Sequence, residues 1–101
     1  MDPKFGGVIW TNHALNRMRE REISQGDAWA TWRKPDQSRY ATAKGAWIYY
    51  RTFRNEKIEV VAKKNENGKW VILSVWSRPV YGKVGKTEPF LSFLIKKIFK
   101  K

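Results

Sequence analysis

The residues of this chain best suited to chemistry are one histidine and two arginines at regular spacing. His13 is the sole histidine among 101 residues, and Arg17 and Arg21 follow it at intervals of four. An imidazole can donate or accept a proton near neutral pH without a large change in its surroundings. Arginine holds a phosphate with a rigid fork of donors and stabilises charge that develops on it. The combination predicts chemistry on a phosphate group.

A helix over residues 12–22 is predicted to carry these three side chains. Thr11 or Asn12 can cap its start, and apolar residues follow at helical spacing. At 3.6 residues per turn, positions four apart drift by only ~40°, so His13, Arg17 and Arg21 form one stripe along the helix. Such a stripe can line a cleft beside the apolar face of the helix.

A second helix is predicted over residues 24–34. Ser24 and Asp27 have the spacing of a capping box at its start, and Pro35 disfavours helical geometry in the residue before it. We expect this helix to serve packing. Three tryptophans are assigned to the core: Trp29, Trp32 and Trp47.

From residue 38 onward the apolar pattern changes to a period of two, which is typical of strands. Short links rich in turn residues separate four such segments, so we expect an antiparallel meander. The segments cover residues 38–43, 46–54, 57–64 and 69–78. Ser74 lies in the last of them.

The remaining chain is predicted to form a loop over residues 79–87 and a basic amphipathic helix over 88–101. The predicted fold class is α+β: two N-terminal helices packed on a four-stranded antiparallel sheet, plus the C-terminal amphipathic basic helix. Residues 1–78 make the helix-plus-sheet domain, and 79–101 make the linker and helix. This helix covers an open sheet face, docks a partner or lies on an anionic membrane, and we favour the first.

The composition points to a polyanionic partner. Lys and Arg number 21 against 9 Asp and Glu, which gives a formal net charge of +12. Aromatic residues make up 15% of the chain. Cations beside aromatic rings are typical of nucleic-acid binding. With no cysteine, one histidine and scattered acids, we expect no metal and no other cofactor. We see no signal peptide, and expect the protein in the cytoplasm or delivered to a target cell's cytoplasm.

One motif resembles a known family. The string His13-Ala-x-x-Arg17-Met-x-x-Arg21-x-Ile-Ser, followed by a helix, a strand meander and residues 71–76, is similar to short bacterial domains of unknown function. These resemble an outlying branch of the RelE-like ribonuclease toxins, grouped with the barnase, EndoU and colicin nucleases. The resemblance covers about residues 9–78. Its pattern has glycine where this chain has Glu22, and a hydroxyl-bearing aromatic where it has Trp76.

The resemblance implies a shared cleft for four residues: His13, Arg17, Arg21 and Ser74. It also implies that Arg78 and Tyr81 occupy a region where RelE-type toxins often keep arginine and tyrosine. A cognate antitoxin or immunity protein is the partner that such a toxin would have. RNA, either free or on ribosomes, is the implied target.

The predicted function is therefore a metal-independent endoribonuclease toxin, in which the ribose 2′-hydroxyl attacks the adjacent phosphate. His13 serves as general acid or base, and Ser74 orients the reacting groups. Phosphate clamps come from Arg17, Arg21 and Arg51, and Tyr49 or Tyr81 supplies the second proton transfer. The alternative is a non-catalytic RNA- or DNA-binding module with a basic, aromatic-rich surface. Its candidate binding residues are Arg51, Arg78, Tyr49, Tyr81 and Trp76.

Overall fold

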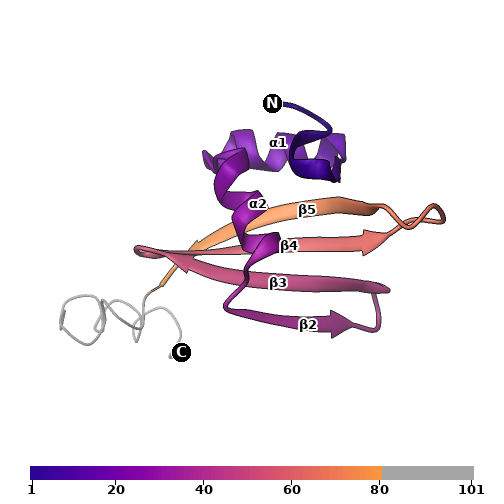
Figure 1. Ribbon diagram of the computed structural model, residues 1–101. Coiled ribbons are helices and arrows are strands. Elements are labelled where there is room, and N and C mark those ends of the chain that lie inside the picture. Colours follow the sequence, from indigo (N-terminus) through magenta and orange to yellow (C-terminus); the bar gives the residue numbers. More distant parts are fainter. Residues whose placement is uncertain (81–101) are drawn as a thin grey trace, which may run out of the picture.

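Two helices pack on one face of a five-stranded sheet (Figure 1). This computed structural model describes residues 1–80. The predicted loop over residues 79–87 is described only at its first two residues, and Pro79 belongs to the last strand instead. The rest of that loop, with Tyr81, and the predicted C-terminal helix lie outside the described residues. The elements are η1 (Phe5–Gly7), β1 (Ile9–Trp10), α1 (Asn12–Arg21), α2 (Gln25–Arg33), β2 (Gln37–Ala41), β3 (Ala46–Phe53), β4 (Glu56–Lys64) and β5 (Trp70–Pro79).

The sheet has the order β1-β5-β4-β3-β2 and is mixed. Strands β2 to β5 form the antiparallel meander that the alternating pattern predicts. The prediction of a four-stranded, wholly antiparallel sheet was wrong, because β1 adds a fifth strand that runs parallel to β5. Only Ile9 and Trp10 form this strand, and two residues are too few to show a period of two.

The helices start at the caps that the sequence predicts. The Thr11 hydroxyl accepts a hydrogen bond from the Ala14 amide at 3.1 Å, and the Ser24 hydroxyl accepts one from the Asp27 amide at 3.0 Å. α2 ends one residue before Lys34, as expected from Pro35. Within residues 1–80, no helix is long and apolar enough to cross a membrane.

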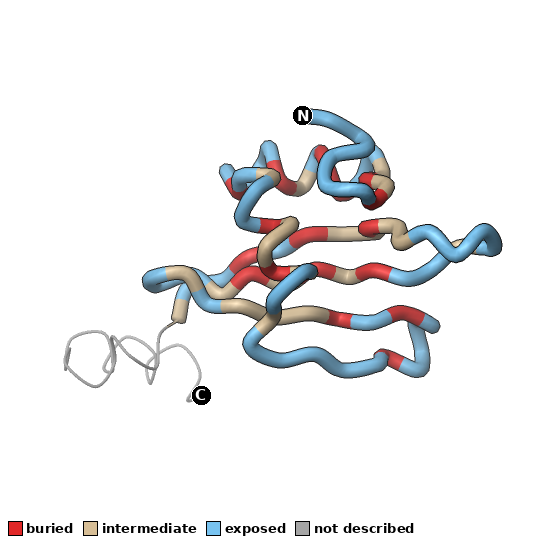
Figure 2. Tube along the Cα trace, viewed as in Figure 1, coloured by how far each residue is buried: buried red, intermediate tan, exposed pale blue. Residues whose placement is uncertain are grey.

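The main core lies between the helices and the sheet, where the buried segments of both layers face each other (Figure 2). Met18 of α1 and three sheet residues, Val60, Ile72 and Val75, are completely buried there. Of the tryptophans assigned to the core, Trp29 and Trp32 pack against it while remaining partly exposed. Trp47 was assigned wrongly, because 40% of its surface is exposed.

A β-bulge in β5 determines which of its side chains point away from the helices. Val61 pairs with Ser74 and Ala62 pairs with Ile72, so Leu73 is an extra residue in β5. Ile72 and Val75 therefore both face the helices, and Ser74, Trp76 and Arg78 point to the opposite side. We call that side the helix-free face, because neither α1 nor α2 covers it. Uninterrupted alternation, as predicted, would have placed Ser74 and Trp76 on the same side as Ile72.

The end of α1 has a strained backbone conformation at Glu22. Glu22 has a φ of 56° and a ψ of 43°, which is the left-handed conformation. The Glu22 and Ile23 amides donate to the carbonyls of Arg19 and Met18, which makes a Schellman cap. Glycine adopts this conformation without the steric cost that a side chain imposes.

We therefore expect Glu22→Gly to raise the free energy of unfolding by about 1 kcal/mol, which corresponds to a rise in Tm of about 4–8 °C for a domain of this size. Thermal unfolding followed by circular dichroism measures the change. Glu20→Gly, the same replacement inside the last turn of α1, is the matched control and should lower Tm. A lower Tm for Glu22→Gly would contradict the cap.

Candidate nucleic-acid interface

Side chains on the helix-free face form three cross-strand rows over β3, β4 and β5. Residues directly opposite each other in neighbouring strands point to the same side of the sheet. The middle row is Tyr50, Glu59 and Trp76. The flanking rows are Ile48, Val61 and Ser74 on one side, and Thr52, Lys57 and Arg78 on the other.

Trp76 carries two arginines from α1. The Arg21 guanidinium carbon lies 3.4 Å from the centroid of the Trp76 ring, and that of Arg17 lies 5.5 Å from it. Arg21 also donates to the Ser77 carbonyl at 3.1 Å, which fixes the guanidinium beside β5. Because 37% of Trp76 remains exposed, the ring and both cations are available to a ligand.

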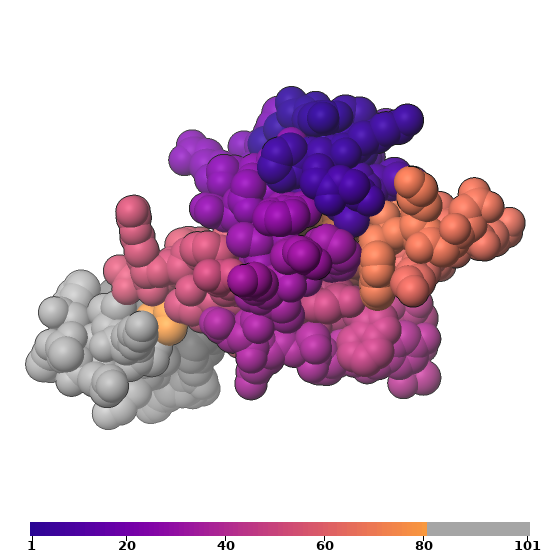
Figure 3. Space-filling model, viewed as in Figure 1, coloured from indigo at the N-terminus to yellow at the C-terminus, as the bar shows by residue number. Residues whose placement is uncertain are grey.

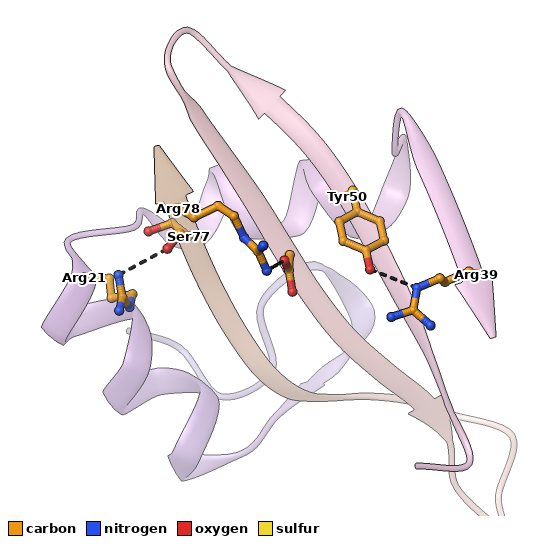
Figure 4. Close-up of polar contacts among 6 residues, drawn as sticks. Arg21, Arg39, Tyr50, Ser77 and Arg78 are labelled. Atoms are coloured by element: carbon orange, nitrogen blue, oxygen red, sulfur yellow. Dashed lines mark hydrogen bonds and ion pairs between the residues drawn. The ribbon is translucent and has the colours of Figure 1, made fainter. Parts of the chain in front are cut away.

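The rest of the middle row is also linked to cations (Figure 4). Glu59 accepts a hydrogen bond from Arg78 and forms an ion pair with it. The Tyr50 hydroxyl accepts a hydrogen bond from Arg39 of β2 at 3.1 Å. The Lys57 ammonium lies 4.7 Å from the centroid of the Tyr50 ring. The row is thus continuous from α1 to the edge strand β2.

The middle row and the charged side chains linked to it form a strongly cationic cluster. It brings together five cations, and the carboxylates that pair with them are Glu59 and Glu20, the latter held by Arg17 at 2.7 Å. Glu59 is the single acid in the three rows. Phosphate groups are attracted to such an excess of positive charge. The cations are Arg17, Arg21, Arg39, Lys57 and Arg78.

His13 lies at the start of α1, beside the bulge. Thr11 fixes this end of the helix, since its amide donates to the Ile72 carbonyl and its hydroxyl to the Leu73 carbonyl. His13 precedes Arg17 by one turn, so helical spacing puts it on the side of α1 from which Arg17 and Arg21 contact Trp76. The imidazole is exposed and makes no hydrogen bond within residues 1–80.

Two residues predicted for the site lie on the other face of the sheet. Arg51 donates to the Lys34 carbonyl at 3.1 Å, where α2 ends, and lies over Phe53. Tyr49 packs against Trp70 beside the core, and burial raises the pKa of its phenol. Neither side chain joins the cluster on the helix-free face, so Tyr49 cannot exchange protons there.

Sequence reasoning missed four members of the cluster. Two of them could have been found by counting in twos from core residues: Ile58 and Val60 face the helices, so Lys57 and Glu59 must face away. The same count in β3 and β2 needs the register between the strands, which local pattern does not supply. The missed residues are Arg39, Tyr50, Lys57 and Glu59.

A hollow of about 680 Å³ adjoins Arg21 at the end of the sheet, between the α1–α2 and β3–β4 turns. Three acids line it, Glu22, Asp27 and Glu56, against two arginines, Arg21 and Arg54. The acids outnumber the cations here, so the hollow is less suited to phosphate than the helix-free face. Within the described part of the chain, no three His, Cys, Asp or Glu side chains are placed so that they could hold one metal ion.

Comparison with protein families matches most of the chain. A family model described as "Domain of unknown function (DUF4258)" matches residues 10–77. No curated protein and no solved structure matches the chain. The description assigns no activity, so the likeness to RelE-type ribonucleases stays a prediction.

Proposed function

This chain belongs to the DUF4258 family, and we propose that it is a metal-independent endoribonuclease. The observation that supports this proposal is the contact of Arg17 and Arg21 with Trp76 on the helix-free face. The two cations can hold a phosphate while the exposed indole stacks on a base.

The proposed reaction is attack by the ribose 2′-hydroxyl on the adjacent phosphorus. The 2′-oxygen to phosphorus bond forms, the bond from phosphorus to the 5′-oxygen breaks, and a 2′,3′-cyclic phosphate and a 5′-hydroxyl result. Glu59 accepts the 2′-hydroxyl proton, and His13, as an imidazolium, donates a proton to the departing 5′-oxygen. Glu59 here takes the role that sequence reasoning gave to Tyr49 or Tyr81.

The remaining residues hold the reacting groups. Arg17 and Arg21 neutralise the charge that builds on the phosphate oxygens during the attack. Ser74 lies in the row next to Trp76, where its hydroxyl can orient the ribose. A small basic ribonuclease of this kind would act as a toxin, with an antitoxin or immunity protein as its partner.

A non-catalytic RNA-binding module is the second candidate. It is favoured by the exposed imidazole of His13, which no hydrogen bond within residues 1–80 orients. The same cations and rings would then hold RNA without cleaving it.

Cleavage of RNA in chelator by the purified full-length chain separates the two functions. We expect products with cyclic phosphate and 5′-hydroxyl ends, and no product from a substrate with a 2′-deoxynucleotide at the cleaved position, because the nucleophile is missing. RNA left intact with and without ribosomes would contradict the ribonuclease proposal. Binding without cleavage would support the second candidate.

A further inference from the structure

A second group of aromatic side chains lies on the helix-covered side of the sheet, away from the cluster described above. Tyr40 and Trp47 are opposite each other on β2 and β3, with ring centroids 5.4 Å apart. Contacts continue from Trp47 to Tyr49 and from Tyr49 to Trp70. We call this row the aromatic ladder. Its inner end, Trp70, contacts Trp32 of α2, whereas its outer end lies over β2 and β3, which stay visible beside α2 (Figure 3).

The outer end of the aromatic ladder is not needed by the core. Tyr40 is 51% exposed and Trp47 is 40% exposed, so both rings keep a large surface in water. Exposed aromatic clusters of this kind mark binding sites more often than isolated exposed residues do. A hollow of about 420 Å³ lies against them, lined by Tyr40, Gly45, Trp47, Lys63, Lys64 and Trp70.

The chemistry of this hollow selects a ligand with planar rings and negative charge. Its lining contains three aromatic rings and two lysines but no carboxylate. Lys64 holds its ammonium 5.7 Å from the centroid of Trp70. The adjacent β4–β5 turn adds one acid, Glu66, beside the same two lysines. Single-stranded nucleic acid combines the rings and the charge, whereas a neutral sugar or apolar peptide would not use the lysines.

The path of the chain connects this hollow to the helix-free face. Arg39 and Tyr40 are neighbours on β2, which is the edge strand, and successive side chains point to opposite faces. Arg39 bonds Tyr50 on the helix-free face, and Tyr40 contacts Trp47 on the other. A strand of RNA bound on the helix-free face can therefore turn around β2 and reach the aromatic ladder.

We propose that Tyr40 and Trp47, with Lys64, form a second binding site that stacks the bases of single-stranded RNA after it passes around β2. The inference rests on the proposed function for the class of ligand, but it concerns binding and not cleavage. A second site makes the affinity for RNA depend on the length of the oligonucleotide, because a short one fills only the helix-free face and a longer one reaches both sites.

The test uses 2′-O-methyl oligonucleotides, which cannot be cleaved, as a tetranucleotide and as a chain of about 16 nucleotides. Fluorescence anisotropy gives Kd for the full-length protein and its variants. Trp47→Ala should weaken binding of the long oligonucleotide by about 5- to 150-fold, the range for loss of one stacked base, and leave binding of the tetranucleotide unchanged. Trp47→Tyr keeps a stacking ring and should retain most of the affinity.

A second measurement does not depend on the folding of the alanine variant. In a ¹⁵N-labelled wild-type protein, the indole N–H signal of Trp47 is the one that disappears in Trp47→Tyr. It should shift when the long oligonucleotide is added. An unmoved signal, or equal Kd values for wild type and Trp47→Ala, would overturn the second site, as would equal weakening with both oligonucleotides. Failure of the wild type to bind either length would instead overturn the proposed function.

Discussion

Replacing His13 with alanine is expected to reduce RNA cleavage by about 10²- to 10⁴-fold, the usual contribution of a positioned general acid or base. The departing 5′-oxygen would then leave without a proton from the protein. His13 is exposed on the first turn of α1, so alanine should leave the fold intact. Initial rates with an end-labelled RNA in chelator measure the loss.

The affinity of His13→Ala for 2′-O-methyl RNA should equal that of the wild type, because the arginines and Trp76 remain. Arg19→Ala is the matched control on the same helix, since Arg19 is exposed and bonds Asn16 instead of joining the stripe. Growth of cells that express each variant adds a second readout. A wild-type rate of cleavage or equal toxicity in His13→Ala would rule out His13 as the catalytic acid.

Replacing Arg21 with alanine is expected to reduce cleavage by about 10²- to 10³-fold, as loss of one preorganised charge donor usually does. Arg21 contributes a cation that both stacks on Trp76 and is anchored by the Ser77 carbonyl. Affinity for 2′-O-methyl RNA should fall as well, with a smaller dependence of log Kd on log salt concentration. Cleavage assays and binding at several salt concentrations measure the two effects.

Arg21→Lys keeps the charge but loses the planar fork, so it should recover only part of the rate. Arg19→Ala removes the same charge from the same helix without touching Trp76, and its cleavage rate should match the wild type. Thermal unfolding checks that the loss of the bond to Ser77 has not unfolded the variant. Equal rates for Arg21→Ala and Arg19→Ala would show that net charge, and not this contact, is what matters.

Local sequence signals predicted the helices and most of the meander. The caps at Thr11 and Ser24 and the stop before Pro35 depend on neighbouring residues only, and each is found where expected. The predicted strands over residues 46–54 and 57–64 differ from β3 and β4 by one residue at single ends. Pairing of β1 with β5 joins segments about sixty residues apart, which no local pattern encodes.

The candidate site was predicted only in part, because it also depends on pairing between strands that local patterns do not encode. His13, Arg17 and Arg21 share a stripe because helical spacing is fixed, and the structure brings both arginines to Trp76. Tyr49 and Arg51 were assigned to the wrong surface for this cluster, because alternation tells which residues share a face but not which face the helices cover. Arg39 joins through the register of β2 and β3.

The bulge at Leu73 lets β5 carry one extra residue without changing which side chains face the helices on either side of it. A chain without Leu73 would join Ile72 directly to Ser74, and regular alternation would still place Ser74, Trp76 and Arg78 on the helix-free face. A chain that kept Leu73 but paired it regularly with β4 would instead turn those three side chains toward the helices. Relatives that differ by this one inserted residue are therefore expected to share the surface as long as the bulge absorbs the insertion.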